Sequence, residues 1–335
     1  MASTFSLFSP AELSFTQIPL SHSSATSYAN DEVPLRPDGR SPLQYRDLVL
    51  QTGVSQAQGA LGSARVVVED AGGTGGGAST EVWAGVRGEV ETMEEGQEGG
   101  KVVVSLEGAP TALPSLPSDL PQTLASLLTS LFSSSVLPAS ILSQLVILPS
   151  SKSWTLYLDV LVLSSAGGNV SDLAVIAARS ALASSRIPAT RSIGFEEEEE
   201  EGKGEAMVLG ETGKVTADEG FSGLVKGGKA GKKAVDFELI DGGEQGVRLK
   251  GWEELPVGLT LNLINQLPHL DSTVLEESAS SSQLIACFTP QGDVCGITQM
   301  GEGEIEFARL MPLVTEASSY AKDLIKTLNA KLKNA

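Results

Sequence analysis

The clearest pattern of apolar and polar positions in this chain lies near its middle, between residues 154 and 188. The segment from Trp154 to Leu163 is rich in Leu and Val, and only Thr155, Tyr157 and Asp159 interrupt it with polar groups. Such a run predicts a strand that is buried on at least one face.

A helix is predicted directly after this strand, beyond a short turn that contains two glycines. Asn169 lies where an N-cap is expected, and Pro188 follows the predicted end, where a helix must stop. The helix has an apolar stripe of mostly small residues, which comprises Val170, Leu173, Ala174, Ala177 and Ala181. Because small side chains let a helix approach a sheet closely, we expect this to be the central helix of a layered domain.

Strands are predicted before this unit, because four segments alternate or are enriched in β-branched residues and are separated by glycine-rich turns. These segments are residues 45–53, 62–70, 79–91 and 101–108. Alternation places Arg65 on the opposite face from Val66, and Arg87 on the opposite face from Val86. Two interpretations of these arginines stay open: they contact RNA or a partner, or they form ion pairs within the chain.

Further helices and strands are predicted on either side of this central unit. Leucines at helical spacing from Leu120 to Leu131 predict a helix that Pro138 ends, ahead of the strand at Trp154. Later strands are predicted at residues 235–240, 257–263, 284–290 and 294–300, with a hairpin turn at 291–293. A long helix from about Glu302 closes the chain, with one apolar stripe from Phe307 to Leu332. The predicted class is α+β, with two sheet-and-helix layers.

Two local signals stand out near the N-terminus. Ser9 and Glu12 have the spacing of a capping box, and Pro10 suits the first helical position, so a short helix is predicted that Pro19 ends. The segment from Arg36 to Arg40 reads Arg-Pro-Asp-Gly-Arg and predicts a tight turn held by its own charges.

Residues 194–234 have a composition unlike the rest of the chain. Glu196 to Glu201 is an unbroken acidic run, and a lysine cluster follows between residues 229 and 233. Such a stretch buries too little apolar area to offset the entropy of ordering it, so we expect a disordered acidic insertion, with a short strand possible at residues 206–209. The lysines could contact phosphates, but a solvated loop is the favoured interpretation.

Composition and charge narrow the function classes. The formal net charge of −19 opposes general attraction to a polyanion, so any contact with nucleic acid must use a local basic patch. The two cysteines form no disulfide or metal framework, and the two histidines leave almost no room for histidine-based metal sites or Ser-His-Asp triads. We expect no cofactor, no metal and no membrane contact, and a soluble protein in a reducing compartment.

An ordered set of short motifs carries a resemblance to a known family. They are Arg36–Arg40, Gly62–Arg65, Glu81–Glu89, Leu158–Leu163, Gly167–Asp172 and Arg186–Pro188. In this order they resemble the RNase PH family, and within it the ring subunits of the RNA exosome. The resemblance covers most of the chain from Pro34 onward, outside the insertion.

The resemblance implies a ribosomal-protein-S5-domain-2-like fold and a place among other RNase PH-like subunits in a heteromeric ring. RNA would be reached through the assembled ring, and the expected locations are nucleus, nucleolus and cytoplasm. Active relatives carry an Asp-x-Pro signature near a strand start, where this chain has Glu254 followed by Leu255 and Pro256. Ala166 also departs from the Asp-Gly-Gly often found in active relatives.

A carboxylate displaced by one methylene is poorly placed for chemistry that needs sub-ångström alignment. The expected function is therefore a non-catalytic structural subunit that supports 3′-to-5′ RNA processing and degradation, including rRNA maturation. The alternative is an active phosphorolytic 3′-to-5′ exoribonuclease that uses Glu254. An unrelated small-molecule-binding protein is a third interpretation. Arg65 and Arg87 are the candidate contacts to RNA or partners, and no catalytic residue is assigned.

The predicted organisation has four parts. Residues 1–34 form an N-terminal helix and connection, and residues 35–193 form a first RNase PH-like sheet-and-helix domain. Residues 194–234 are the low-complexity insertion, and residues 235–335 form a second RNase PH-like domain.

Overall fold

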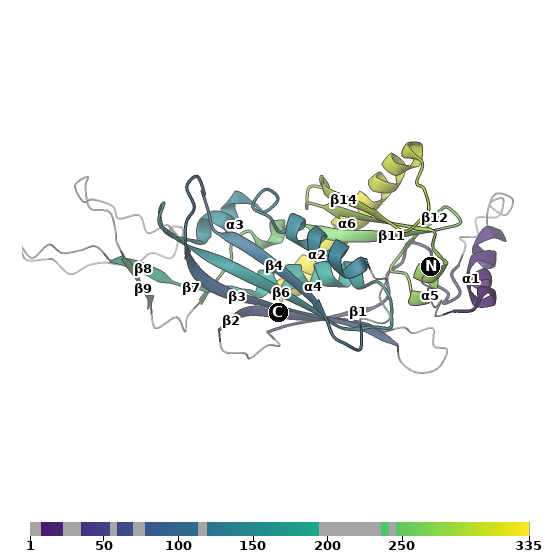
Figure 1. Ribbon diagram of the computed structural model, residues 1–335, viewed down its shortest axis with the longest axis horizontal. Helices are drawn as coiled ribbons and strands as arrows, with labels where there is room; N and C mark the ends of the chain where they lie inside the picture. The colour runs from purple at the N-terminus through teal and green to yellow at the C-terminus, as the bar shows by residue number, and fades with distance from the viewer. Residues whose placement is uncertain are drawn as a thin grey trace, which may run out of the picture.

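Two β-sheets enclose the central helices of the molecule (Figure 1). The computed structural model describes residues 8–22, 35–53, 59–69, 78–112, 119–193, 236–240 and 246–334. The larger sheet has the strand order β1 (Leu48–Thr52), β2 (Ala60–Glu69), β3 (Ser79–Thr92), β6 (Lys152–Ser165) and β4 (Lys101–Gly108), with β5 (Val146–Leu148) paired to β6. All of its pairs are antiparallel except β4 with β6.

The smaller sheet comes from the C-terminal half of the chain. Its order is β12 (Leu267–Leu270), β11 (Val257–Ile264), β13 (Ser282–Phe288) and β14 (Val294–Met300), all antiparallel. Two short ribbons join the halves: β7 (Arg186–Pro188) pairs with β10 (Gly246–Arg248), and β8 (Thr190–Ile193) pairs with β9 (Asp236–Leu239).

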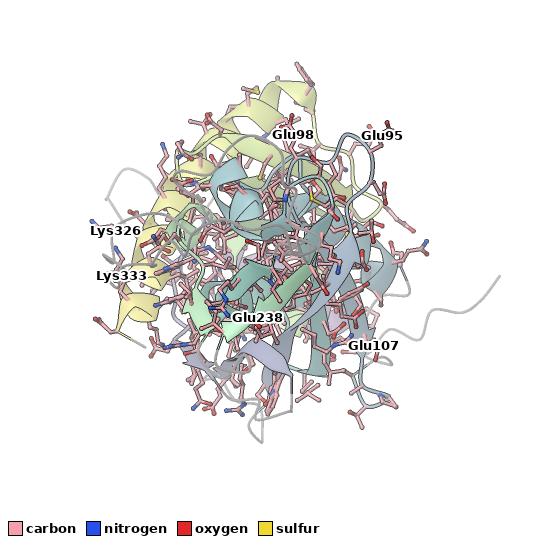
Figure 2. The ribbon with its side chains drawn as sticks, turned by 90° about the vertical axis from the view of Figure 1, so that its left-hand side faces the viewer. Glu95, Glu98, Glu107, Glu238, Lys326 and Lys333 are labelled. Atoms are coloured by element: carbon pink, nitrogen blue, oxygen red, sulfur yellow. The ribbon has the colours of Figure 1, made fainter. Side chains whose placement is uncertain are left out.

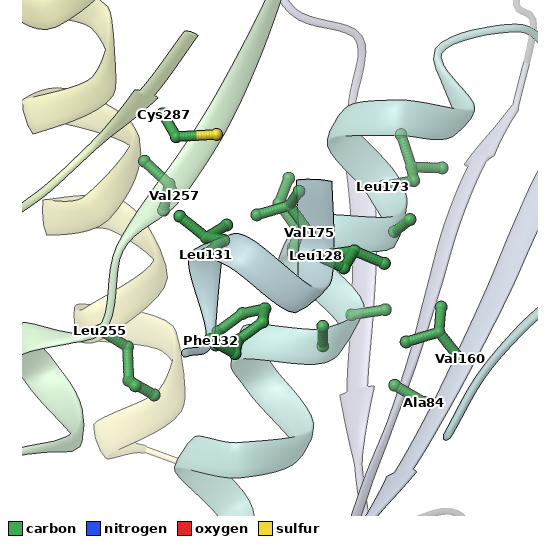
Figure 3. Close-up of a cluster of buried hydrophobic side chains, with 14 of the residues drawn as sticks. Ala84, Leu128, Leu131, Phe132, Val160, Leu173, Val175, Leu255, Val257 and Cys287 are labelled. Atoms are coloured by element: carbon green, nitrogen blue, oxygen red, sulfur yellow. The ribbon is translucent and has the colours of Figure 1, made fainter. Parts of the chain in front are cut away.

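The helices form layers between and outside the sheets. They are α1 (Pro10–His22), α2 (Leu120–Leu131), α3 (Ala139–Gln144), α4 (Val170–Ser184), α5 (Val274–Ala279) and α6 (Phe307–Lys333). Helix α4 contacts β2, β3 and β6 on one side and β11 on the other, and α2 lies beside it between β4 and β14. Helix α6 packs against β11 and β13 from the side away from α4 (Figure 3).

The core explains why α4 must be built from small residues. In Figure 3, Val257 and Cys287 lie on one side of α2 and α4, while Ala84 and Val160 lie on the other. Every residue from Val170 to Ala183 is buried. A helix packed between two sheets has no solvent face, so its short side chains set how closely the sheets approach. The α+β prediction with two sheet-and-helix layers is confirmed.

Several boundaries differ from the sequence prediction. Helix α1 has the predicted capping box, with Ser9 N donating to Glu12 Oε2 at 2.7 Å, but it continues to His22, so the stop at Pro19 was wrong. A proline in the last turns of a helix removes one hydrogen bond without forcing the chain to leave the helix. Helix α6 begins at Phe307 rather than near Glu302. Strand β12 and helix α5 were not predicted.

The caps of α4 and the start of α6 also differ. Asn169 stands at the N-cap of α4 but is left-handed, with φ of 56°, and its side chain does not cap the helix. The apolar stripe of α6 is buried from Leu313 onward, yet Phe307 and Met311 are exposed. The division into four domains stays a prediction, and the predicted insertion at residues 194–234 lies outside the described residues.

Deleting residues 194–234 and joining the ends with a short Gly-Ser linker should leave the melting temperature within about 3 °C of the parent. The flanking strands β8 and β9 already bring Ile193 opposite Asp236, so a short linker can close the gap, and loop length adds little closure entropy. Thermal unfolding followed by circular dichroism measures this. A fall of about 10 °C or more would show that the segment contributes to the folded core.

Candidate functional site

Arg65 lies on the face of the larger sheet that points away from α4. Its Nε donates to Glu81 Oε1 at 2.6 Å and its Nη1 to Gln51 Oε1 at 3.2 Å. Trp83 Nε1 donates to the same Glu81 oxygen at 2.7 Å. The pKa of Glu81 lies below its usual value, chiefly because Arg65 donates to it. Arg65 therefore forms an ion pair within the chain, which is one of the two interpretations that the sequence left open.

Arg87 lies on the same outer face, farther along β3. Its Nε donates to Asp159 Oδ2 at 2.9 Å, and its guanidinium carbon lies 5.7 Å from the ring centre of Tyr157. Asp159 also accepts from Ser105 Oγ at 2.7 Å. Both candidate arginines therefore share one face but are paired separately within the chain. Their role as contacts to RNA or a partner stays a prediction.

Glu254 ends a 3₁₀ turn, Trp252–Glu254, directly before β11. The residue is exposed, and within the described part of the chain its carboxylate forms no hydrogen bond or ion pair. Its backbone N–H donates to Gly251 O, which holds the turn. The sequence placed this carboxylate correctly near a strand start, but among the described residues no basic side chain pairs with it.

A buried cluster that was not predicted as a site joins three distant segments. We call Arg36, Arg40, Arg46, Asn169, Asp271 and Glu276 the arginine–aspartate cluster. Arg46 donates through Nε and Nη2 to the two oxygens of Asp271, at 2.9 and 2.8 Å, and through its backbone N at 2.7 Å. Asn169 Nδ2 donates to Asp271 Oδ1 at 2.8 Å. One aspartate thus holds the N-terminal segment, the turn before α4 and the β12–α5 junction together.

The other two arginines complete the cluster. Arg40 donates through Nη1 to Asp271 Oδ2 at 3.2 Å and pairs with Asp38 at 2.6 Å. Arg36 lies 3.4 Å from Glu276 Oε2 and also donates to the carbonyl oxygens of Pro42 and Leu270. The segment from Arg36 to Arg40 is the predicted turn, but only Arg40 pairs within it.

The turn before α4 is shaped to reach this cluster. Gly168 has φ of +76°, and a Cβ there would lie 2.6 Å from Ser272 O, so only glycine fits. Arg46 Nη1 donates to Gly167 O at 2.7 Å, and Thr80 Oγ1 donates to Gly168 O at 2.7 Å. The sequence did contain one usable signal, because Thr273 and Glu276 have capping-box spacing and form that box at the start of α5.

The carboxyl groups around the cluster differ in the direction of their pKa shifts. Burial alone would raise the pKa of Asp271, but the hydrogen bonds and charge of Arg46 outweigh it and hold the pKa below its usual value. Asp172, next to the cluster, has no such cation. Burial raises its pKa to about 7, although Tyr45 donates to its Oδ2 at 3.0 Å. Burial also raises the pKa of Glu277 to about 7, against the backbone N–H of Asn169.

Replacing Asp172 with Asn should stabilise the chain above pH 7. The folded chain holds the Asp172 proton more tightly than the unfolded chain, whose pKa is near 3.8. Its contribution to stability is therefore present below about pH 4 and is lost as the pH rises to about 7. We expect Asp172→Asn to match the parent near pH 4 and to exceed it by on the order of 4 kcal/mol at pH 8.

Melting temperatures between pH 4 and pH 8.5 measure this difference. The exposed Asp293, in the β13–β14 turn, supplies the matched control, since Asp293→Asn makes the same chemical change on the surface and should leave the melting temperature close to that of the parent. An Asp172→Asn effect that does not change with pH would contradict the argument.

Other chemistry is sparse in the described residues. They contain no group of three or more His, Cys, Asp or Glu side chains placed to hold a metal ion. Burial raises the pKa of the Cys287 thiol, and that of Cys295 to about 11, so neither is activated as a thiolate. In the same part of the chain, no helix has the length and apolar character needed to span a bilayer.

The surface charge is unevenly distributed. In the end view of Figure 2, Glu95 and Glu107 lie on one side of the molecule, and Lys326 and Lys333 of α6 lie on the other. A cavity of about 780 Å³ beside α3 has Glu94, Glu95 and Glu98 in its wall.

Comparison with known proteins finds a matching family model for part of the chain and solved structures with the same fold. Residues 44–188 match the model of the RNase PH family, described as 3′ exoribonuclease family, domain 1. The backbone superimposes on a chain of the Archaeoglobus fulgidus exosome with RNA bound to the active site, with a TM-score of 0.61 and 18% identity, covering 95% of this chain and 97% of that one. This chain has an RNase PH-like fold.

Several of the curated proteins that are similar to this chain are described as exosome complex component Rrp42. The exosome complex component Rrp42 of Methanosarcina acetivorans is 24% identical over 292 residues, which is 86% of each chain. The component of the same name from Sulfurisphaera tokodaii is 34% identical over 157 residues, which is 46% of this chain and 53% of the relative. An archaeal exosome core chain also superimposes, with a TM-score of 0.61, 18% identity and coverage of 95% and 96%.

Proposed function

We propose that this chain is a structural, non-catalytic subunit of an RNA exosome ring built from RNase PH-like proteins. In that ring it supports 3′-to-5′ RNA processing and degradation, including rRNA maturation. The likeness to exosome components named Rrp42 supports the assembly, because it runs through 86% of both chains rather than through one domain. Other RNase PH-like subunits are its partners, and RNA is reached through the assembled ring.

The partners of its carboxylates and arginines are the observation that supports the lack of catalysis. Phosphorolysis needs basic groups that grip phosphate and carboxylates that face it. Here Asp271 is 1% exposed and accepts hydrogen bonds from Arg40, Arg46 and Asn169. Glu254 is exposed, but no arginine or lysine of the described residues pairs with it. The cluster therefore acts as an internal clamp, and the exposed carboxylate lacks a phosphate-binding neighbour within the described chain.

The alternative is a phosphorolytic 3′-to-5′ exoribonuclease, which the description of the matched family favours. The isolated chain, given inorganic phosphate, magnesium and an adenosine-rich RNA, should release no nucleoside diphosphate, because its acidic surface also disfavours capture of the RNA backbone. Chromatography of the products measures this. Phosphate-dependent release that Glu254→Gln abolishes would establish the enzyme instead.

Assembly has its own test. Co-expression with the RNase PH-like subunits encoded by the same genome should give a stoichiometric ring on gel filtration, and the chain alone should elute smaller. A fluorescent tag on the chain should follow the other ring subunits through nucleus, nucleolus and cytoplasm. A chain that stays apart from all of them would contradict the proposed function.

A further inference from the structure

The first turns of α6 carry two large apolar side chains that the described chain does not cover. Phe307 is 81% exposed and Met311 is 62% exposed, and these are the two most exposed large apolar side chains of α6. They are four residues apart, so they lie on one face of the helix. We call Phe307 and Met311, together with the preceding Glu302, Glu304 and Glu306, the α6 tip. Figure 1 shows this end of α6 standing clear of the sheets.

The α6 tip is held in place rather than loosely attached. Arg309 donates through Nη2 to Gln266 O at 2.7 Å and through Nη1 to Gln266 Oε1 at 2.5 Å, which ties the first turn to the β11–β12 turn. Gly303 N donates to Ser281 O at 2.8 Å just before the helix. From Leu313 onward the same helix is buried along one face. A fixed helix that presents two apolar side chains loses little entropy on binding.

The charge of the tip selects its partner. Glu302, Glu304 and Glu306 are exposed, and none of them forms an ion pair with another described residue. Their charge disfavours RNA and anionic membrane surfaces, and it repels a second copy of the same tip. A partner must therefore offer an apolar recess for Phe307 and Met311 with basic side chains around it.

We propose that the α6 tip docks into an apolar groove, rimmed by Lys or Arg side chains, on a neighbouring RNase PH-like subunit. This inference rests on the proposed function, since it names the surface through which this chain meets one ring neighbour. Phe307 and Met311 enter the groove as adjacent side chains of one helix face. The three glutamates face the basic rim and make the encounter dependent on salt.

The test compares three forms of the full chain, each titrated with the RNase PH-like subunits encoded by the same genome. They are the parent, the double variant Phe307→Ser with Met311→Ser, and a control with Val294→Ser and Ile297→Ser, which removes two exposed apolar side chains of β14. The tip variant should bind its neighbour about 30-fold more weakly, as expected for a hot spot, while the control binds like the parent. All three should melt alike, because the changed side chains are exposed.

Two further arms fix the nature of the partner. The variant Glu302→Lys, Glu304→Lys and Glu306→Lys should also weaken binding and should abolish its salt dependence. A photo-reactive benzophenone residue at position 307 should crosslink to one ring subunit, at a segment containing Lys or Arg.

The outcomes separate this inference from the proposed function. Assembly of the tip variant as tightly as the parent would overturn the docking surface while leaving ring membership standing. Failure of the parent to bind any ring subunit would overturn both. Crosslinking of position 307 to a second copy of this chain, or to anionic vesicles included as a competitor, would replace the proposed partner.

Discussion

Replacing Asp271 with Asn should lower the stability of the chain by about 3–5 kcal/mol, the usual cost of removing one partner from a buried ion pair. Asn keeps the shape of the side chain and tolerates the left-handed φ of 49° at this position, so the change isolates the charge. Arg46 and Arg40 would then lose the carboxylate that accepts their hydrogen bonds and balances their charge. A chain of this size should then melt about 10 °C lower.

The matched control for this variant is Asp323→Asn, at an exposed position of α6, which should melt within about 2 °C of the parent. A second variant sharpens the interpretation. Asp271→Asn combined with Arg46→Met removes both charges, and it should recover part of the loss, because no unpaired Arg46 remains beside the aspartate site. An Asp271→Asn chain that melts like the parent would show that the cluster does not join the halves.

The fold was largely predictable because its elements repeat simple periodicities. The buried run from Trp154 to Leu163 became β6, and the alanine-rich stripe became α4. Strand β12 was missed because Leu267–Leu270 contains Pro268 and His269, which break both apolar continuity and alternation. Helix α5 was missed because six residues are too few to show a 3.6-residue period.

The candidate site was much less predictable, because it depends on contacts between residues far apart in the sequence. Arg36 and Asp271 are 235 residues apart, and no local pattern connects them. The Arg-Pro-Asp-Gly-Arg motif predicted a turn, which is confirmed, but a turn forms from local backbone geometry and does not reveal where its first side chain goes. Arg65 and Arg87 were placed on the correct face by alternation alone, since facing is a local property and partners are not.

The exposure of the first turns of α6 was also not predicted, because it depends on tertiary packing rather than on a local pattern. Helical periodicity grouped Phe307 and Met311 with Val314 and Ala317, because all four lie on one stripe. Periodicity gives the face of a helix but not the length of core that covers it, and on α6 burial begins only at Leu313. The sequence therefore shows the whole apolar stripe, but only the structure shows which part of the stripe is exposed.

Replacing Ala181 with Glu should destabilise the chain even more than the loss of the Asp271 charge. Ala181 is fully buried in α4, and α4 packs against strands of both sheets. The backbone of β2 passes close by, because a Cβ at Gly62 would lie 2.7 Å from Ala181 O. This close packing leaves no space for a longer side chain and no water to solvate its carboxylate. Overpacking and an unpaired buried charge together should cost at least about 5 kcal/mol.

A loss of that size approaches the whole stability of a typical domain, so the Ala181→Glu chain should be largely unfolded or insoluble at about 37 °C. The fraction of soluble chain and its circular dichroism spectrum measure this outcome. Ala330→Glu makes the same chemical change at an exposed position of α6 and should leave both unchanged. Ala181→Gly, which adds no volume, should fold and lose only about 1 kcal/mol, so that bulk and charge rather than helix propensity are tested. A soluble Ala181→Glu chain that melts like the parent would mean that α4 is not enclosed between the two sheets.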